Sequence, residues 1–590
     1  MSVFSKRKVN VAAKRNKSHI ALPSRVITTN DFGFCQPIFC REVVPGDNWK
    51  FDLDSFTRLA PMPVPTYADI RNVTRGFYIR YSSLWKPWED FLAGREYIDD
   101  QGTPHMFTSV PTISNSTLCQ WFSNTVSTQL STVVGHDSDI GKIKYDFHTE
   151  DSSQNKELRN FTPAGRRLFT LLNNLGYKLN FAYISRIGAD LQFSLLPLLA
   201  YLRAYYDYYL PSRYTNKNQL RYIFDLVEYN NKEVYDLMQT LVSESLYNNY
   251  DSDYFTASWL DPQNPDATES SPSSISSPVT ADTNMSVTVT PHSALIPLID
   301  TNSTLRNLSQ PVIDLLKRSY DYVIRNGLSG NRYFEQIFAR FGIKLPNILT
   351  RRCEFIGQYQ DNIQVMDVTS MAASASAPLG AYAGKGYVAS HGNMSFEAND
   401  YGVVVLINTI IPQGGYVQGV NREMTHIHKL DFFTPEFDCI GMQAIANYEL
   451  IGQSNTVDEM NAIEDGGFVM DGVFGFVPRY SEYRRPIDVL SGTFALGSQN
   501  AGYNCYHSFR LFDLTSTSYP SNTLSFRQLD PAYNGNDYQR IFYVDDDSVD
   551  HFITVHNIKA DVFRKMKTFD DAFDLDGSEK VITDPDCQLH

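Results

Sequence analysis

The residues best suited to chemistry lie in one short segment, VFGFVPRYSEYRRP, which spans Val473–Pro486. Guanidinium groups form forked hydrogen bonds with carboxylates and carbonyls, and tyrosine rings supply rigid contact area. The segment contains no pair of histidine, cysteine or serine residues that could act as nucleophile and base. Its composition therefore predicts recognition of another surface rather than catalysis. The six residues concerned are Arg479, Tyr480, Glu482, Tyr483, Arg484 and Arg485.

Motifs for other chemistry are weak or absent in the rest of the chain. The stretch GAYAGKG at 380–386 lacks the spacing of a phosphate loop, and no His-Glu-x-x-His or Gly-x-Ser-x-Gly occurs. His426 and His428 would place two imidazoles on one face of a strand, which can hold a metal, but no third ligand is evident. The acidic run at 544–551 reads as a solvated turn, with loose binding of a divalent cation as the alternative. The sequence thus predicts no enzyme, no metal site and no cofactor.

The composition favours a β-rich protein that buries much surface against itself or its neighbours. Aromatic residues make up 13 % of the 590 residues, whereas charged residues make up only 20 %. No apolar run reaches the length needed to cross a membrane, and the lysine-rich start is not followed by the apolar core of a secretory signal. The seven cysteines are odd in number and scattered, which favours folding in a reducing cytoplasm.

Positive charge is concentrated at the N-terminus. Residues 1–25 contain seven lysines and arginines and no acid, so the remaining chain carries −22 of a net charge of −15. A basic arm on an acidic body is typical of a tail that binds polyanions, although a solvated terminus without a partner fits equally well. The candidate nucleic-acid-binding residues in this arm are Lys6, Arg7, Lys8, Lys14, Arg15 and Lys17.

Strand patterns occur early and late in the chain. In DNWKFDLDSF the apolar residues Trp49, Phe51 and Leu53 alternate with charged ones, which predicts a half-buried strand. The segment RNVTRGFYIRY at 71–81 reads as a second strand, and YGVVVLINTII at 401–411 reads as a strand buried on both faces.

Between these clusters the periodicity becomes helical. Here apolar residues recur at three- and four-residue spacing, which predicts helices that pack through these residues. They are Leu195, Leu199, Leu202, Tyr206 and Tyr209; Ile313, Leu316, Tyr320 and Val323; and Tyr333, Phe334, Ile337, Phe338 and Phe341. A Ser/Thr/Pro-rich stretch at about 262–302 begins with a part that lacks large apolar residues, so we expect a surface loop there, with an interdomain linker as the rival interpretation.

These patterns divide the chain into a β scaffold that carries an insertion. The expected organisation is a basic arm at 1–30, a β core at 31–95 and 345–560, a partly helical excursion at 96–344 and an acidic tail at 561–590.

Several sequence blocks resemble, in order, those of the major capsid proteins of microviruses, in particular the gokushovirus-like and prophage-like branches. The first blocks are VPGDNWKFDLDSFTRLAPMPVPTYADI, LWKPWEDFL, LLPLLAYLRAYYDYY and DYFTASWLDPQ. The later blocks are NRYFEQIFARFG, RRCEFIGQYQ, GVNREMTHIHKLDFFTPEFDCIGMQAI and VFGFVPRYSEYRRPIDVLSGTF. Together they span about 40–495.

The resemblance implies a mainly β fold with inserted helices: an eight-stranded antiparallel jelly roll with large loop insertions. It further implies sixty copies in an icosahedral shell around circular single-stranded DNA, in a virion assembled in the host cytoplasm. The implied partners are a small basic DNA-packaging protein, other virion proteins and a host surface receptor met by the loop at 262–302. In such a shell the segment around Arg484 would serve as a subunit interface, with an internal Arg–Glu network or contact with packaged DNA as alternatives.

A phage-borne glycan-binding or glycan-cleaving β protein remains the alternative class, because tyrosines and tryptophans can stack on sugars. The chain has no solenoid repeats and no acidic pair among its five tryptophans, which counts against it.

Overall fold

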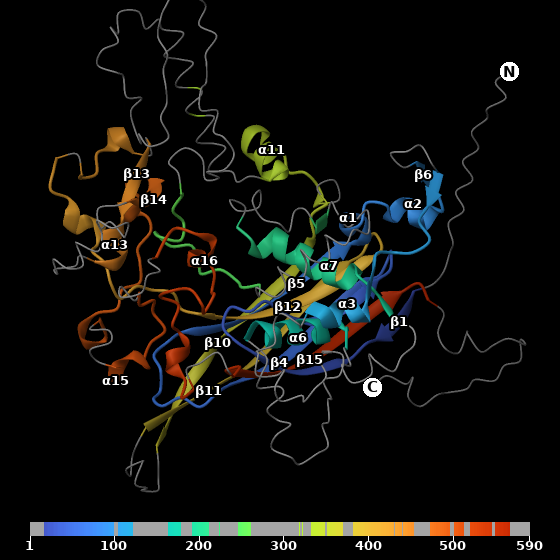
Figure 1. Cartoon of the computed structure of the whole chain (residues 1–590), viewed down its shortest axis with the longest axis horizontal. Helices are drawn as coiled ribbons and strands as arrows, with labels where there is room; N and C mark the ends of the chain where they lie inside the picture. The colour runs from blue at the N-terminus through green and yellow to red at the C-terminus, as the bar shows by residue number, and fades with distance from the viewer. Residues whose placement is uncertain are drawn as a thin grey trace, which may run out of the picture.

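A computed structural model describes most of the two strand clusters and part of the excursion (Figure 1). The described residues are 17–98, 104–121, 163–178, 191–211, 223–224, 246–260, 318, 321, 332–347, 351–369, 382–429, 431–438, 441–452, 473–495, 501–512, 520–544 and 549–566.

The long strands at the centre of Figure 1 form one curled antiparallel sheet with the order β1-β15-β4-β11-β10-β5-β12-β3, and β2 extends the edge at β1 by also pairing with β15. Because of the curl, two four-stranded halves, β2-β15-β4-β11 and β10-β5-β12-β3, face each other and pack their side chains in one core. This is the arrangement of a jelly-roll barrel with insertions. The strands are β1 Ser18–Ala21, β2 Ser24–Asn30, β3 Gln36–Val43, β4 Asn48–Leu59, β5 Ile70–Arg80, β10 Glu354–Thr369, β11 Tyr382–Glu397, β12 Gly402–Pro412 and β15 Phe552–Arg564.

Side-chain alternation fixes which face of each strand enters the barrel. In β4, Trp49, Phe51 and Leu53 are at most 2 % exposed and pack against Val404 and Leu406 of the opposite half. The predicted strand at 48–54 and its inward face are therefore confirmed. The early and late strand clusters share one sheet, as the predicted insertion requires.

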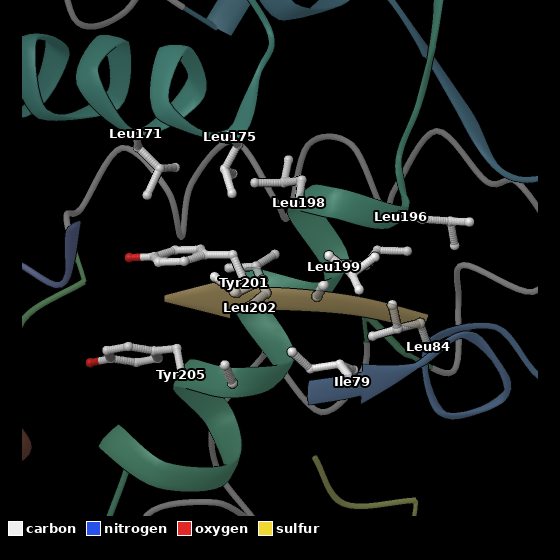
Figure 2. Close-up of a cluster of buried hydrophobic side chains, with 14 of the residues drawn as sticks. Ile79, Leu84, Leu171, Leu175, Leu196, Leu198, Leu199, Tyr201, Leu202 and Tyr205 are labelled. Atoms are coloured by element: carbon white, nitrogen blue, oxygen red, sulfur yellow. The ribbon is translucent and has the colours of Figure 1, made fainter. Parts of the chain in front are cut away.

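The outer face of β5, β12 and β3 is covered by helices. Helix α6 (Pro163–Leu175) packs with α7 (Leu196–Ala204), and Figure 2 shows Leu171 and Leu175 of α6 pointing towards α7. Beneath the helices lies Ile79 of β5, in the same buried cluster as Val403 and Val405 of β12. This cover explains why β12 is buried along its whole length, as its unbroken apolar pattern predicts.

The remaining elements are short. A separate ribbon, β13 (Met442–Ala446) with β14 (Val473–Pro478), lies at the left of Figure 1 with α13 (Asn447–Ile451). Two more strand pairs are β6 (Glu96–Ile98) with β7 (Pro104–Met106) and β8 (Thr112–Ser114) with β9 (Gln192–Ser194). The other helices are α1 Tyr81–Leu84, α2 Trp88–Ala93, α3 Asn115–Gln120, α11 Tyr333–Phe341, α15 Ala501–Asn504 and α16 Leu524–Arg527. Single turns are a π-helix at Tyr205–Tyr209 and 3-10 helices at Arg422–Thr425, Pro435–Phe437, Ser481–Tyr483 and Gln539–Ile541.

Three expectations differ from the structure in detail. Residues 18–30, assigned to the arm, form β1 and β2, and β15 continues to Arg564. The predicted strand through His426 and His428 is wrong, because a 3-10 turn spans Arg422–Thr425 and the described residues 426–429 are not in a strand. The helix at 333–341 is confirmed, but none of its residues is buried.

The four residues of the second predicted helical face, Ile313, Leu316, Tyr320 and Val323, and the loop at 262–302 lie outside the described residues. None of the helices in the described ranges is long and apolar enough to span a membrane.

Candidate subunit-contact surface

The segment with three arginines leaves the ribbon through a tight turn. Strand β14 ends at Pro478, which pairs with Met442 of β13, and the chain then turns at Tyr480. Tyr480 has a φ of 63°, a left-handed conformation that is uncommon for a tyrosine. The following 3-10 turn, Ser481–Tyr483, directs the next residues outwards.

Tyr480 faces the interior of the chain. It is 2 % exposed, and its ring packs edge-on against Phe433 at a centroid distance of 5.1 Å. Its hydroxyl donates to the carbonyl of Phe432 at 3.2 Å and accepts from the backbone N–H of Thr434 at 3.3 Å. Tyr480 therefore anchors the segment 432–434 onto the turn and offers no contact area to another molecule.

Glu482 is likewise turned inwards, with a side chain 7 % exposed. Its Oε2 accepts a hydrogen bond from Gln443 Nε2 at 2.5 Å, and Nε2 of His426 lies 3.7 Å from its Oε1. The glutamate thus links the turn to β13 and to the loop that carries His426.

The arginines lie on the other side of the turn. Arg484 Nη2 contacts both carboxylate oxygens of Asp438 at 2.6 and 2.7 Å, and Arg479 lies 5.0 Å above the ring of Phe437. The carboxylate bound by Arg484 is therefore Asp438 and not the nearby Glu482. Arg485 and Tyr483 are exposed, the latter to 50 %.

Large apolar side chains are exposed around the turn. Phe432 is 54 % exposed and Phe433 is 48 % exposed, and both lie with Tyr483 in a cluster of ring contacts about His426. Met424 and Ile427, 72 % and 78 % exposed, lie in the same loop. We call these five exposed side chains, Met424, Ile427, Phe432, Phe433 and Tyr483, the aromatic shoulder. Exposed apolar patches of this kind mark sites of protein–protein contact.

A polar cavity of about 510 Å³ lies beside the turn and includes Arg484 and Arg485 in its wall. Its wall also carries the ion pair between Arg71 Nη2 and Asp251 Oδ2 at 2.5 Å, and Asp253, which accepts from the hydroxyl of Tyr416 at 2.7 Å. With charges of both signs on its wall, the cavity suits polar side chains of another chain better than an apolar ligand.

Sequence reasoning identified the arginine turn but missed the shoulder. The signal was present in THIHKLDFFTPEF, where apolar residues recur without helical or strand periodicity. Nothing in that pattern showed that the loop folds onto Tyr480 and leaves its phenylalanines half exposed.

Of the six arm residues, only Lys17 is described, and it is exposed. The other five, Lys6, Arg7, Lys8, Lys14 and Arg15, lie outside the described residues. Strand β1, which follows directly, pairs with the end of β15, and His19 contacts Asp561 at 3.1 Å. The arm is therefore joined to the edge of the half β2-β15-β4-β11.

Among the described residues, one group could supply three metal ligands: Asp52, Asp54 and His391. The ammonium of Lys559 already lies 3.3 Å from Asp54, and a hydrogen bond that Asp54 accepts from His391 raises the pKa of this histidine. The contacts with Lys559 and His391 account for the two carboxylates without an ion. Asp545–Asp547, the acidic run considered above, lies outside the described residues.

Comparison with known proteins gives consistent results. Residues 8–133 and 320–573 match a family model described as capsid protein (F protein). The chain is 27 % identical over 201 residues, 33 % of each chain, to the capsid protein VP1 of Chlamydia phage 1. It is 27 % identical over 165 residues to the capsid protein VP1 of Bdellovibrio phage phiMH2K, covering 27 % of this chain and 29 % of that one. The alignments thus span about a third of the length of these relatives.

Proposed function

The chain belongs to the phage capsid protein (F protein) family and is a structural capsid protein, and from this we propose that sixty copies form an icosahedral shell around circular single-stranded DNA. The observation that supports assembly most directly is the aromatic shoulder beside the arginine turn, since an isolated chain gains nothing from exposing such residues. A closed shell would bury them against neighbouring subunits.

The mass of the assembled particle tests this proposal. A chain of 67.1 kDa in sixty copies gives a particle of about 4 MDa, visible by sedimentation and by negative-stain microscopy. A purified chain that stays monomeric under all conditions and is retained by immobilised glycans would instead support the glycan-binding alternative.

We propose that Arg479, Arg484 and Arg485, with Tyr483 and the rest of the aromatic shoulder, form contacts between subunits. Tyr480 and Glu482 support this surface from inside the chain. The polar cavity gives Arg484 and Arg485 a setting in which a partner's carboxylate or carbonyl could reach both guanidinium groups.

Replacing Arg484 and Arg485 together by lysine should lower the yield of particles severalfold. Lysine keeps the charge but loses the planar fork that binds Asp438 and a partner simultaneously. Arg95→Lys is the matched control, because the side chain of Arg95 is 71 % exposed and lies 3.9 Å from Asp90 in a loose pair. Particle yield is measured by sedimentation, and a normal yield from the double variant would contradict a role in assembly.

We also propose that the Ser/Thr/Pro-rich stretch at 262–302 projects from the outer surface and contacts the host receptor. Its first part has few large apolar residues, so its removal should cost the fold little. Deleting 268–280 should leave the particle yield unchanged and reduce adsorption to host cells. Replacing the same residues by a Gly/Ser linker is the control for length, and loss of assembly in both variants would rule out a purely external role.

The basic arm is proposed to bind packaged DNA without sequence preference. Encoding 590 residues takes about 1770 nucleotides, whereas sixty arms of seven charges supply only about 420 positive charges, so the arm cannot neutralise the genome. A small basic packaging protein, polyamines or metal ions would supply most of the countercharge. The arm would then position DNA rather than condense it.

Replacing all six arm residues by glutamine should reduce the DNA content of particles more than the particle yield. The six are Lys6, Arg7, Lys8, Lys14, Arg15 and Lys17. Exchanging lysine for arginine and arginine for lysine at the same positions keeps the charge and serves as the control. Normal DNA content in the glutamine variant would assign the arm to contacts between subunits.

A further inference from the structure

The half β2-β15-β4-β11 has an outer face that the described residues leave open. Along β4, the even-numbered residues from Lys50 to Arg58 face outwards, and Lys50, Phe56 and Arg58 are exposed, whereas the odd-numbered residues point into the barrel. On the other half, α6 and α7 cover the outer face of β3, β5 and β12. Among the described residues, nothing comparable covers β2, β15, β4 and β11.

The strand register brings apolar side chains together on this open face. Ile27 of β2 pairs with Val555 of β15, and Val555 pairs with Phe56 of β4, so the three form a row across the strands. Ile27 is 65 % exposed and Phe56 is 45 % exposed. In the next row Ile553, 51 % exposed, pairs with Arg58, which in turn pairs with Tyr387 of β11.

Two aromatic rings form the centre of this patch. The rings of Phe56 and Tyr387 have centroids 6.2 Å apart and planes inclined by 31°, so they do not cover each other. Their faces remain available to a third planar group. Such inclined, partly exposed rings on an open sheet are the platforms on which single-stranded nucleic acids stack their bases.

Unpaired cations flank the rings. Arg25 of β2, Arg58 of β4 and Lys385 of β11 are exposed and make no ion pair with any residue that the structure describes. The acids of the same face are differently placed: Asp52 and Asp54 contact Lys559 and His391, and Asp561 contacts His19. The positive charge beside Phe56 and Tyr387 is therefore not cancelled locally, and it is available to an anion.

We propose that this face binds single-stranded DNA, with Phe56 and Tyr387 stacking on bases and Arg25, Arg58 and Lys385 contacting phosphates. The proposal rests on the proposed function, since it assigns a surface of the barrel to the enclosed genome. The basic arm enters the same half through β1, which pairs with β15, so arm and face belong to one continuous side of the barrel.

A second copy of the chain fits this face less well. If the same face of another subunit met it, the unpaired arginines and lysine would oppose one another, and burying like charges is unfavourable. A polyanion with planar bases satisfies both the cations and the rings. Contact with a different face of a second copy is a distinct outcome that the experiment below separates.

Binding of the full-length chain to a fluorescein-labelled oligo-dT of about twenty nucleotides, followed by anisotropy, tests the proposal. Phe56→Ser with Tyr387→Ser should weaken binding about thirtyfold or more, because the variant loses both rings on which bases stack. Arg25→Gln with Arg58→Gln should reduce the salt slope by about 1.4, the value for two phosphate contacts on a single strand. Tyr67→Ser with Tyr333→Ser, at positions 81 % and 72 % exposed elsewhere, is the matched control and should bind normally.

Photo-cross-linking of wild-type particles that carry iodouracil-substituted DNA gives a second measurement that needs no variant. Cross-links at Tyr387 or Phe56 support the proposal. Particles that contain DNA but cross-link only outside β2, β4, β11 and β15 would overturn it and leave the capsid function intact, whereas particles without DNA would refute the proposed function itself. Normal oligo-dT affinity with reduced particle yield in the serine variant would assign the face to subunit contact and would also overturn the proposal.

Discussion

Replacing Asp47 by alanine should lower the free energy of unfolding by about 3 kcal/mol, because it leaves a largely buried guanidinium without its carboxylate. Asp47 is fully buried, and Arg564 is only 16 % exposed. Arg564 donates through Nε at 3.0 and 2.9 Å and through Nη2 at 2.6 Å to the two oxygens of Asp47. The pair joins the loop before β4 to the end of β15, so it connects residues that are 517 positions apart.

A comparison of two variants separates charge from hydrogen bonding at this site. Asp47 also accepts from the backbone N–H of Val44 at 3.0 Å and from Trp49 Nε1 at 3.3 Å. Asp47→Asn keeps an acceptor for these donors, so it should destabilise the chain less than Asp47→Ala. Urea unfolding of the purified chain provides the measurement, with Asp54→Ala, on the strand that follows, as a more exposed control. Equal midpoints for Asp47→Ala and Asp54→Ala would show that the buried pair contributes nothing.

The strands of the barrel could be predicted because each carries its own pattern. Alternation at Trp49, Phe51 and Leu53 indicates one buried face, and the unbroken apolar run of β12 indicates two. The helical spacing from Leu195 to Tyr209 likewise predicts α7, although the structure continues it as a π-helix from Tyr205. These sequence patterns are local. The structure reproduces them because the buried positions of a strand or helix recur with the period of its backbone.

The candidate sites could be predicted only in part, because they depend on contacts between distant residues. The arginine turn was identifiable, but its Tyr480 lies inside the chain and its Arg484 binds Asp438, 46 residues away. The open face combines Ile27 with Val555, whose pairing follows from the closure of the sheet and not from either strand alone. The residue types in the sequence indicated which chemical groups each candidate site contains, whereas the strand register determined which residues lie next to one another in it.

His556 makes the fold sensitive to acid. It lies inside the barrel on β15 with an exposure of 0 %, and burial lowers its pKa from the usual 6.5 to about 4. Neither ring nitrogen has a hydrogen-bond partner among the described residues, so none of their carboxylates stabilises the protonated form. The folded chain therefore keeps the imidazole neutral, whereas the unfolded chain protonates it near its ordinary pKa.

Because the pKa is lowered in the folded state, the unfolded state binds more protons as the pH falls below 6.5. Stability is therefore lost on acidification, and the loss from this residue alone should be about 2 kcal/mol between pH 7 and pH 5. His551 has the opposite effect on how stability depends on pH. Asp31, 3.2 Å from its Nδ1, raises its pKa against the effect of burial, so its contribution is full below pH 6.5 and is lost as the pH rises through its raised pKa.

The variant His556→Leu isolates the effect of the first histidine from that of the second. Wild type and variant share His551 and all carboxylates, so the difference between their free energies of unfolding reports His556 alone. That difference should change by about 2 kcal/mol in favour of the variant as the pH falls from 7 to 5. His507→Leu is a useful companion, because burial also lowers the pKa of His507 to about 4 and Arg540 lies 3.2 Å from its Nδ1. Urea unfolding at half-unit steps of pH gives the curves, and a difference that stays constant from pH 7 to pH 5 would show that His556 does not titrate as its buried position requires.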